Sequence, residues 1–270
     1  MRVEAERSLA RAFGIRAGDL VSTVGAGGKT ALVYRLVREL TSAGVPVVAT
    51  TTTRVWYPAE ETMPEVVVGE GNDSHIEVLR SVVAERGFAM SGSSESGGKL
   101  LGHSPEFLDE LMLSNPGWAV VAECDGARGA SLKVPAEHEP PLPSRTSVYV
   151  VVIGVDCIGE RIDSSLVFNA ERVAAVTGVD INARVDEEIA ATSVLSADSY
   201  LGRRPGKARM HVLLNKAVLS RLWPRGIEGT AAQGDPVMAL ALKLLASGEI
   251  EAVAAGSAGG GDAASFAILR

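Results

Sequence analysis

Short apolar runs alternate with stretches of helical periodicity in the N-terminal part of the chain. Residues 19–25 read DLVSTVG, a run typical of a strand that is buried on both faces. After a glycine-rich turn, Leu32, Leu36 and Leu40 recur at the spacing of one helix face. Residues 45–53, VPVVATTTT, then have the pattern of a second strand. Strand, loop, helix and strand in this order predict a βαβ unit of a parallel sheet.

The same alternation continues along the rest of the chain. Strands are predicted at 65–68, 118–123, 147–154, 209–214 and 250–255, and helices at 4–13, 104–113, 169–177, 186–197 and 235–247. This order favours an α/β fold, with a doubly wound, mostly parallel sheet and helices on both faces. We expect one domain over residues 1–270. Within it, SGSSESGG at 91–98 has the composition of a flexible surface loop.

Composition and charge exclude several classes of protein. With 46% hydrophobic and 22% charged residues, the chain is neither disordered nor fibrous. A net charge of −7 argues against a large nucleic-acid-binding surface, because such a surface needs clustered lysine and arginine. Its longest apolar stretches, such as 148–155, are far shorter than the ~18 residues of a membrane span. The first residues also lack the apolar core of a signal peptide. We expect a cytoplasmic protein that binds neither nucleic acid nor membrane.

The turn after the first predicted strand carries the clearest chemistry. It consists of Gly25, Ala26, Gly27, Gly28, Lys29 and Thr30. Glycines allow backbone N–H groups to face an anion, and the helix that follows adds its positive N-terminal end. Lys29 would neutralise the outer phosphates of a nucleotide, and the Thr30 hydroxyl would ligate Mg²⁺. The spacing G-x-x-G-K-T is shorter than that of the usual P-loop, whose first glycine position falls on Thr23. It is similar to the loop of Mur-ligase-type P-loop proteins.

Two other interpretations of this turn are weaker. A dinucleotide-binding turn would read G-x-G-x-x-G, followed by an acid at the end of the second strand. Here the third position is Thr30, and the second strand ends in threonines. An ordinary strand-to-helix turn explains the glycines but not the Gly-Lys-Thr sequence. We therefore interpret residues 25–30 as a phosphate-binding loop, which makes the predicted fold P-loop NTPase-like.

A nucleoside-triphosphate site also needs an acid at the end of a neighbouring strand. The stretch WAVVAECDGARG at 118–129 supplies Glu123 and Asp125 where an apolar run ends. Residues two apart in a strand point to the same side, so both carboxylates can face one site. A solvated Glu before an Asp-Gly turn is the alternative. Arg128 and Lys133, in the irregular segment that follows, are candidates for stabilising phosphate charge.

Two further stretches lie where ligands of open α/β sheets collect. The threonines at 50–53, including Thr52, end the second strand, so their hydroxyls are candidates for contacts with magnesium or phosphate. The alternative is that they are ordinary β-branched strand residues. Asn215 and Lys216 end a later strand and are candidates for packing against a base. Many nucleotide-switch proteins read guanine with Asn-Lys-x-Asp, but Val218 stands where the acid would be, so the base is left open.

Several stretches together resemble one family. GDLVSTVGAGGKT, VVATTTTRV, KLLGHSP, VVAECDGARGASLKVPAEHEPPLP and LLNKA occur in the order found in YqeC-type proteins, over most of residues 9–220. These are accessory proteins of selenium-dependent molybdenum hydroxylases, with a P-loop nucleotide-binding fold expected for the family. The family pattern carries over onto Gly25, Gly27, Gly28, Lys29, Thr30, Glu123, Asp125, Arg128, Lys133, His138 and Glu139.

These observations predict a Mg²⁺-dependent protein that binds ATP or GTP and acts as an NTPase or phosphoryl-transfer enzyme. Lys29 and the loop amides would bind phosphates, and Thr30 and Asp125 would hold the metal. Glu123, a further candidate for holding the metal, would also polarise water or an acceptor hydroxyl. The resemblance implies a role in selenium metabolism, in the maturation of a molybdenum hydroxylase or its cofactor. Two alternatives stay open: a non-catalytic, nucleotide-gated chaperone for the apo-enzyme, and a Mur-like ATP-dependent ligase.

Overall fold

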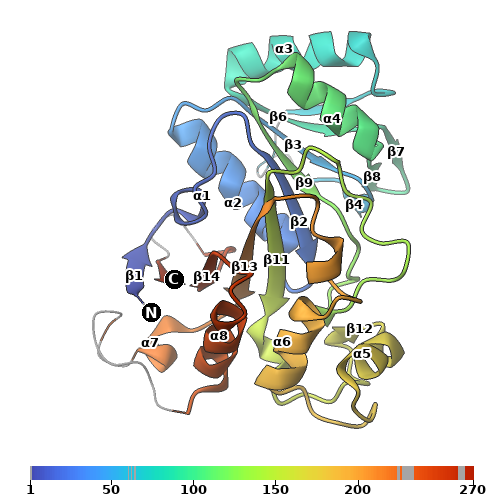
Figure 1. Cartoon of the computed structure of the whole chain (residues 1–270). Helices are drawn as coiled ribbons and strands as arrows, with labels where there is room; N and C mark the ends of the chain where they lie inside the picture. Colours follow the sequence, from blue (N-terminus) through green and yellow to red (C-terminus); the bar gives the residue numbers. More distant parts are fainter. Residues whose placement is uncertain are drawn as a thin grey trace.

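A ten-stranded sheet forms the centre of the computed structural model, which describes residues 2–59, 61, 63, 65–223, 226, 234–260 and 265–270 (Figure 1). In spatial order its strands are β1 (Val3–Glu6), β15 (Phe266–Leu269), β14 (Ala252–Ala255), β13 (Arg209–Asn215), β11 (Val148–Gly154), β2 (Leu20–Gly25), β9 (Ala119–Glu123), β3 (Val47–Thr51), β6 (Phe88–Gly92) and β5 (Val66–Val68). Only the pairs of β15 with β1 and with β14 are antiparallel; the other neighbours are parallel.

Helices cover both faces of this sheet. One face packs against α1 (Leu9–Ala12) and α2 (Lys29–Ser42). The core on the other face takes side chains from α3 (Asp73–Arg86), α4 (Pro105–Ser114), α5 (Ala170–Thr177), α6 (Glu187–Leu195), α7 (Leu219–Leu222) and α8 (Pro236–Ala246). The predicted α/β fold, a mostly parallel sheet between two layers of helices, is confirmed (Figure 1).

The two cores follow from the strand and helix periodicities. Successive side chains of β2 alternate between them: Leu20 and Val24 lie in one core, and Val21 lies in the other. Burial on both faces explains why the parallel strands read as continuous apolar runs. On α2, Leu32 and Leu36 are fully buried against the sheet. Burial of each such side chain contributes about 1.5–3 kcal/mol to folding.

Strand β2 lies where the strand order reverses. The chain leaves β2 through α2 for β3, β6 and β5 on one side, and after β9 it continues to β11, β13 and β14 on the other. In doubly wound sheets, ligands bind outside the carboxyl ends of the strands at this switch point. Gly25 ends β2 and residues 26–28 follow at that edge, so the fold places the predicted phosphate-binding loop where a ligand site is expected.

Two small sheets lie outside the main one. Strands β4 (Arg54–Trp56), β8 (Lys99–Leu101) and β7 (Ser94–Ser96) form an antiparallel sheet in that order. Strands β10 (Leu132–Lys133) and β12 (Val167–Phe168) form a parallel pair. Short 3₁₀ turns occupy Val155–Cys157 and Leu201–Arg203. Among the described residues, no helix is both long and apolar enough to cross a membrane.

The structure differs from the sequence-based expectation in several places, and strands such as β6 and β15 were not predicted. The helix predicted at 4–13 is only Leu9–Ala12, because Val3–Glu6 pair with β15 as an edge strand. Within the predicted surface loop at 91–98, Ser91 and Gly92 are buried at the end of β6, and Ser94–Ser96 form β7. The flexibility of the segment stays a prediction, and so does the single domain. Helix α3 was not predicted, although Asn72 caps its start and Gly87 ends it with a φ of 82°.

Candidate functional site

The loop after β2 depends on glycine at two positions of close backbone approach. Gly25 and Gly27 have φ values of 95° and 90°, a region that other residues rarely adopt. A Cβ atom on Gly25 would lie 2.3 Å from the carbonyl oxygen of Val152, and one on Gly27 would lie 2.3 Å from the nitrogen of Gly154. The loop therefore lies directly against the end of β11, and a side chain at either position would push it away.

Several backbone N–H groups of this loop face no acceptor. The N–H of Gly25 donates to Asp125 Oδ2 at 3.1 Å, and that of Ala26 donates to the carbonyl of Val152 at 2.9 Å. Among the described residues, no hydrogen bond takes up the N–H of Gly27 or Gly28. Helix α2 starts at the next residue, and the first N–H groups of a helix have no intrahelical acceptor. Together these groups form a cradle that suits an anion.

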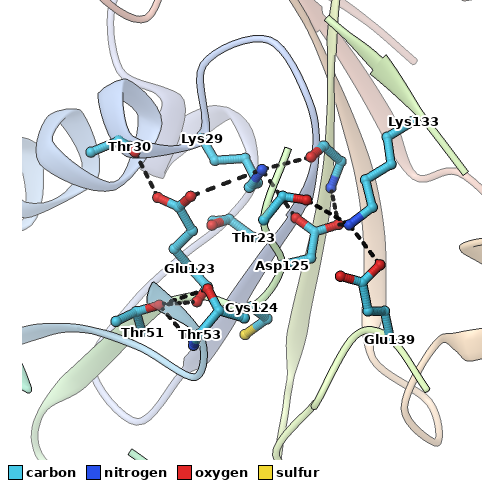
Figure 2. Close-up of polar contacts among 12 residues, drawn as sticks. Thr23, Lys29, Thr30, Thr51, Thr53, Glu123, Cys124, Asp125, Lys133 and Glu139 are labelled. Atoms are coloured by element: carbon cyan, nitrogen blue, oxygen red, sulfur yellow. Dashed lines mark hydrogen bonds and ion pairs between the residues drawn. The ribbon is translucent and has the colours of Figure 1, made fainter. Parts of the chain in front are cut away.

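Lys29 lies inside this cradle and is 4% exposed. Its Nζ donates to the carbonyl of Gly25 at 2.6 Å and lies 3.0 Å from Asp125 Oδ1 and 3.9 Å from Glu123 Oε1 (Figure 2). Asp125 Oδ1 accepts no hydrogen bond, so its contact with Lys29 is an ion pair only. Lys29 is thus folded back onto its own loop and the acidic end of β9.

Thr30 and Glu123 join the start of α2 to the end of β9. Thr30 Oγ1 donates to Glu123 Oε2 at 2.7 Å (Figure 2). Burial raises the pKa of Glu123, and this outweighs the lowering effect of Lys29 and Thr30; the negative charge of Asp125 raises it further. The carboxyl group therefore holds a proton more readily than an exposed glutamate does, unless another cation comes close.

Asp125 is fully buried and accepts from several directions. Besides the Gly25 amide and Lys29, it takes a hydrogen bond from the Tyr200 hydroxyl to Oδ2 at 2.9 Å and lies 3.5 Å from Lys133 Nζ. Burial, followed by the charge of Asp125, raises the pKa of Tyr200 well above its usual value, so the phenol stays protonated as a donor. Tyr200 was not predicted as a site residue, and no local signal marks it, because it reaches Asp125 only through the fold.

Lys133 is a buried cation with three acceptors inside the protein. Besides Asp125, its Nζ donates to the carbonyl of Gly126 at 2.6 Å and pairs with Glu139 Oε2 at 2.8 Å (Figure 2). Although burial alone would raise the pKa of Glu139, the hydrogen bonds from Lys133 and from the Ala136 amide lower it. We interpret Lys133 as a brace between Asp125 and the segment that carries Glu139. Its predicted contact with a transferring phosphate stays a prediction.

The charges of this cluster suit a divalent cation. Two ammonium groups, Lys29 and Lys133, stand against three carboxyl groups, Glu123, Asp125 and Glu139. A triphosphate added to such a site needs a further cation to offset its charge. In the part of the chain that the structure describes, no three His, Cys, Asp or Glu side chains gather as a metal site. Mg²⁺ is commonly held by one or two protein oxygens together with phosphates and water, so the Thr30–Glu123 pair fits it.

Of two other predicted residues, Thr52 supports the site from its border and Arg128 lies at the surface. Thr52 donates from its backbone N–H to the carbonyl of Glu123 at 3.0 Å and from its hydroxyl to the carbonyl of Pro141 at 2.9 Å. Arg128 is exposed, has a φ of 47°, and holds its guanidinium 5.4 Å from the ring centre of Phe168. The structure therefore brings Lys29, Thr30, Glu123, Asp125 and Lys133 together and leaves Arg128 at the surface.

Asn215 and Lys216 lie on the other side of the loop. Asn215 Nδ2 donates to the carbonyl of Gly27 at 2.7 Å, and its Oδ1 accepts from the Ala258 amide at 2.8 Å. These bonds hold the end of β13 against the loop. Lys216 follows with a φ of 63°, and its Nζ donates to Ser131 Oγ at 2.8 Å and to Asp156 Oδ2 at 2.7 Å. Their predicted contact with a base stays a prediction.

Comparison with known proteins identifies the family. The family profile described as "YqeC protein" matches residues 21–171, more than half of the chain. The chain belongs to the YqeC family. It is also similar to a curated relative, the "Uncharacterized protein YqeC" of Escherichia coli (strain K12), with 31% identity over 160 residues. That match covers 59% of this chain and 61% of the relative, which is less than two thirds of the relative's length. The family resemblance seen in the sequence is confirmed, and the matched range contains the loop, β9 and Lys133.

Proposed function

We propose that this YqeC-family protein binds a nucleoside triphosphate with Mg²⁺ at residues 25–30 and hydrolyses it or transfers its terminal phosphoryl group. One observation carries the proposal: the loop is joined to the end of β9 and the residues after it by Lys29 on Asp125 and by Thr30 on Glu123. Phosphoryl-transfer sites need a lysine for the outer phosphates, and a hydroxyl with an acid for the metal. Both pairs of groups lie here at the N-terminus of one helix.

Binding of the triphosphate exchanges the partners of Lys29. Its Nζ leaves the Gly25 carbonyl and Asp125 for phosphate oxygens, while the N–H groups of Gly27 and Gly28 donate to the same phosphates. A buried carboxylate that loses its only partner is strongly unfavourable. Asp125 avoids this because the Tyr200 hydroxyl, Lys133 and the Gly25 amide stay beside it. Because these three groups stay beside Asp125, Lys29 can move to the phosphates.

Thr30 and Glu123 would hold the metal ion. Mg²⁺ would supply positive charge that neutralises the phosphates. Glu123 is the better protein ligand, because it already accepts from Thr30 and its raised pKa falls when a cation comes close. Asp125 is fully buried and paired with Lys29, so it would position Lys29 and the loop instead. The proposal therefore keeps Glu123 as a candidate metal ligand and gives Asp125, which the sequence suggested for the metal, the role of positioning Lys29.

A nucleotide-gated chaperone is a second candidate function. Thr52 contacts the carbonyl of Pro141, and Lys133 pairs with Glu139, so two site residues hold the segment 134–143. A change at the phosphates would reach that segment through these contacts. The role in maturation of a selenium-dependent molybdenum hydroxylase, as enzyme or chaperone, rests on the family resemblance.

A thermal-shift screen tests nucleotide binding. Wild-type protein is heated with ATP, GTP, CTP or UTP, each with Mg²⁺ or with EDTA, beside Lys29→Ala and the control Lys243→Ala. Lys243 is a half-exposed lysine paired with Glu188, far along the chain from the loop. We expect a Mg²⁺-dependent rise in melting temperature for the wild type and Lys243→Ala, and none for Lys29→Ala. A rise of equal size in Lys29→Ala would refute the site.

Phosphate release then separates the two candidate functions. The nucleotide with the largest thermal shift is incubated with the wild type and Mg²⁺, and inorganic phosphate is measured over time. Steady release that Lys29→Ala lacks supports the NTPase. Tight binding without release supports the gated chaperone.

A further inference from the structure

A small cavity lies beside the phosphate-binding loop, and the Lys216–Asp156 pair described above forms part of its lining. Its volume is about 260 Å³, and it is bordered by the turn after β11, the residues after β13 and the start of α8. The cavity adjoins the loop through two consecutive residues. The Asn215 side-chain amide donates to the Gly27 carbonyl, and the next residue, Lys216, lines the cavity. The residue that contacts the loop and a residue that lines the cavity are therefore neighbours in the sequence.

Its size suits part of a nucleotide. Pockets that enclose a whole drug-sized ligand span roughly 300–1,000 Å³. At about 260 Å³, this one takes a fragment such as a heterocyclic base. Ile158, Val218 and Leu222 form apolar walls, which suit the faces of a flat aromatic ring. Since the loop would hold the phosphates, a neighbouring cavity of this size would hold the base of the same nucleotide.

Two charged groups give the cavity its polarity on the loop side. Asp156 Oδ2 accepts from Lys216 Nζ at 2.7 Å, and Lys216 also donates to Ser131. Although burial alone would raise the pKa of Asp156, the hydrogen bonds from Lys216 and Ser131 lower it, so the group is a carboxylate that only accepts hydrogen bonds. Its side chain is 39% exposed, which leaves room for a further donor.

The backbone at Lys216 is held in an uncommon conformation. Its φ of 63° is in the left-handed region, which is unfavourable for a non-glycine residue and is often found at ligand-binding sites. This conformation turns the chain directly after Asn215, so that Asn215 bonds the loop while Lys216 reaches Asp156. The turn therefore links the phosphate cradle to the cavity carboxylate.

We propose that this cavity receives the nucleotide base and that Asp156 selects guanine. The proposal rests on the nucleotide binding proposed above. A carboxylate with two acceptor oxygens matches the adjacent N1–H and 2-amino donors of guanine. Adenine offers an acceptor at N1 beside its amino group, and that acceptor would face the carboxylate unpaired. Asp156 thus supplies, from the turn after β11, the acid that Val218 does not supply after β13.

The test compares four nucleotides by isothermal titration calorimetry with Mg²⁺: GTP, ITP, XTP and ATP. For the wild type we expect GTP to bind at least about tenfold more tightly than ATP, because a polar site rejects a base that leaves its groups unpaired. ITP, which lacks the 2-amino group, should fall between them. In Asp156→Asn the amide can pair with the 2-oxo group and N1–H of xanthine, so the preference should move from GTP to XTP.

Asp163→Asn is the matched control. Asp163 is an exposed aspartate that does not line the cavity, and its Oδ2 pairs with Arg161 at 2.8 Å. This variant should keep the wild-type order of affinities. Equal affinity for all four nucleotides in the wild type, or an equal loss for all four in Asp156→Asn, would overturn the base assignment alone. If no nucleotide bound the wild type at all, the proposed function would fail and the base assignment with it.

Discussion

Removal of Lys29 should weaken the fold as well as nucleotide binding, because this side chain is an internal ion-pair partner. Lys29 and Asp125 are 4% and 0% exposed and lie 3.0 Å apart. Removal of one partner of a buried pair costs about 3–5 kcal/mol. Asp125 keeps the Gly25 amide, the Tyr200 hydroxyl and Lys133, so we expect Lys29→Met to cost about 3 kcal/mol, the lower end of that range.

A double-mutant cycle isolates the contribution of the pair. Free energies of unfolding are measured by urea denaturation for the wild type, Lys29→Met, Asp125→Asn and the double variant. Since the double variant leaves no unpaired charge, its cost should be smaller than the sum of the single costs by about 1–2 kcal/mol. Lys243→Met, at a half-exposed lysine, should cost no more than about 1 kcal/mol. Additive single costs, within about 0.5 kcal/mol, would refute the buried pair.

Three further predictions concern other parts of the structure. Gly27→Ala should abolish nucleotide binding in calorimetry, because its Cβ would lie 2.3 Å from Gly154 N, whereas Gly44→Ala, with a φ of 75° and open space, should bind normally. Thr30→Val should keep the melting temperature of the nucleotide-free protein within a few degrees but lose the Mg²⁺-dependent part of nucleotide affinity; equal affinity with and without EDTA in the wild type would contradict this. Burial and nearby arginine charges lower the pKa of His211 to about 3. The unfolded chain binds this proton near pH 6.5, so stability present above that pH is lost as pH falls towards 3. The free energy of unfolding, measured by urea denaturation at several pH values in this range, should therefore depend on pH less steeply in His211→Leu than in the wild type, by up to about 1.4 kcal/mol per pH unit.

The parts of the fold that local sequence encodes were the ones that could be predicted. Strand β2, helix α2 and strand β3 follow from apolar runs and helical spacing within single segments. Strand β1 could not be found in this way, because its four residues become a strand only by pairing with β15 at the other end of the chain. Local periodicity contains no information about such a partner.

The same distinction holds for the candidate site. The loop follows the end of β2, Glu123 ends β9, and Asp125 lies two residues later, so their meeting was expected from parallel-sheet geometry. Tyr200 and Asp156 carry no motif, and only the fold brings Tyr200 to Asp125 and Asp156 to Lys216. The division of roles between Glu123 and Asp125 also required the structure, since both are acids at one strand end.

Calorimetric titration of Mg²⁺-nucleotide into the wild type and into Lys29→Ala tests the central claim most directly. The account predicts saturable binding at one site per chain in the wild type, loss of that binding in EDTA, and at least a tenfold lower affinity in Lys29→Ala, equal to about 1.4 kcal/mol. The same affinity in both proteins, or no binding to the wild type by any nucleoside triphosphate, would contradict it.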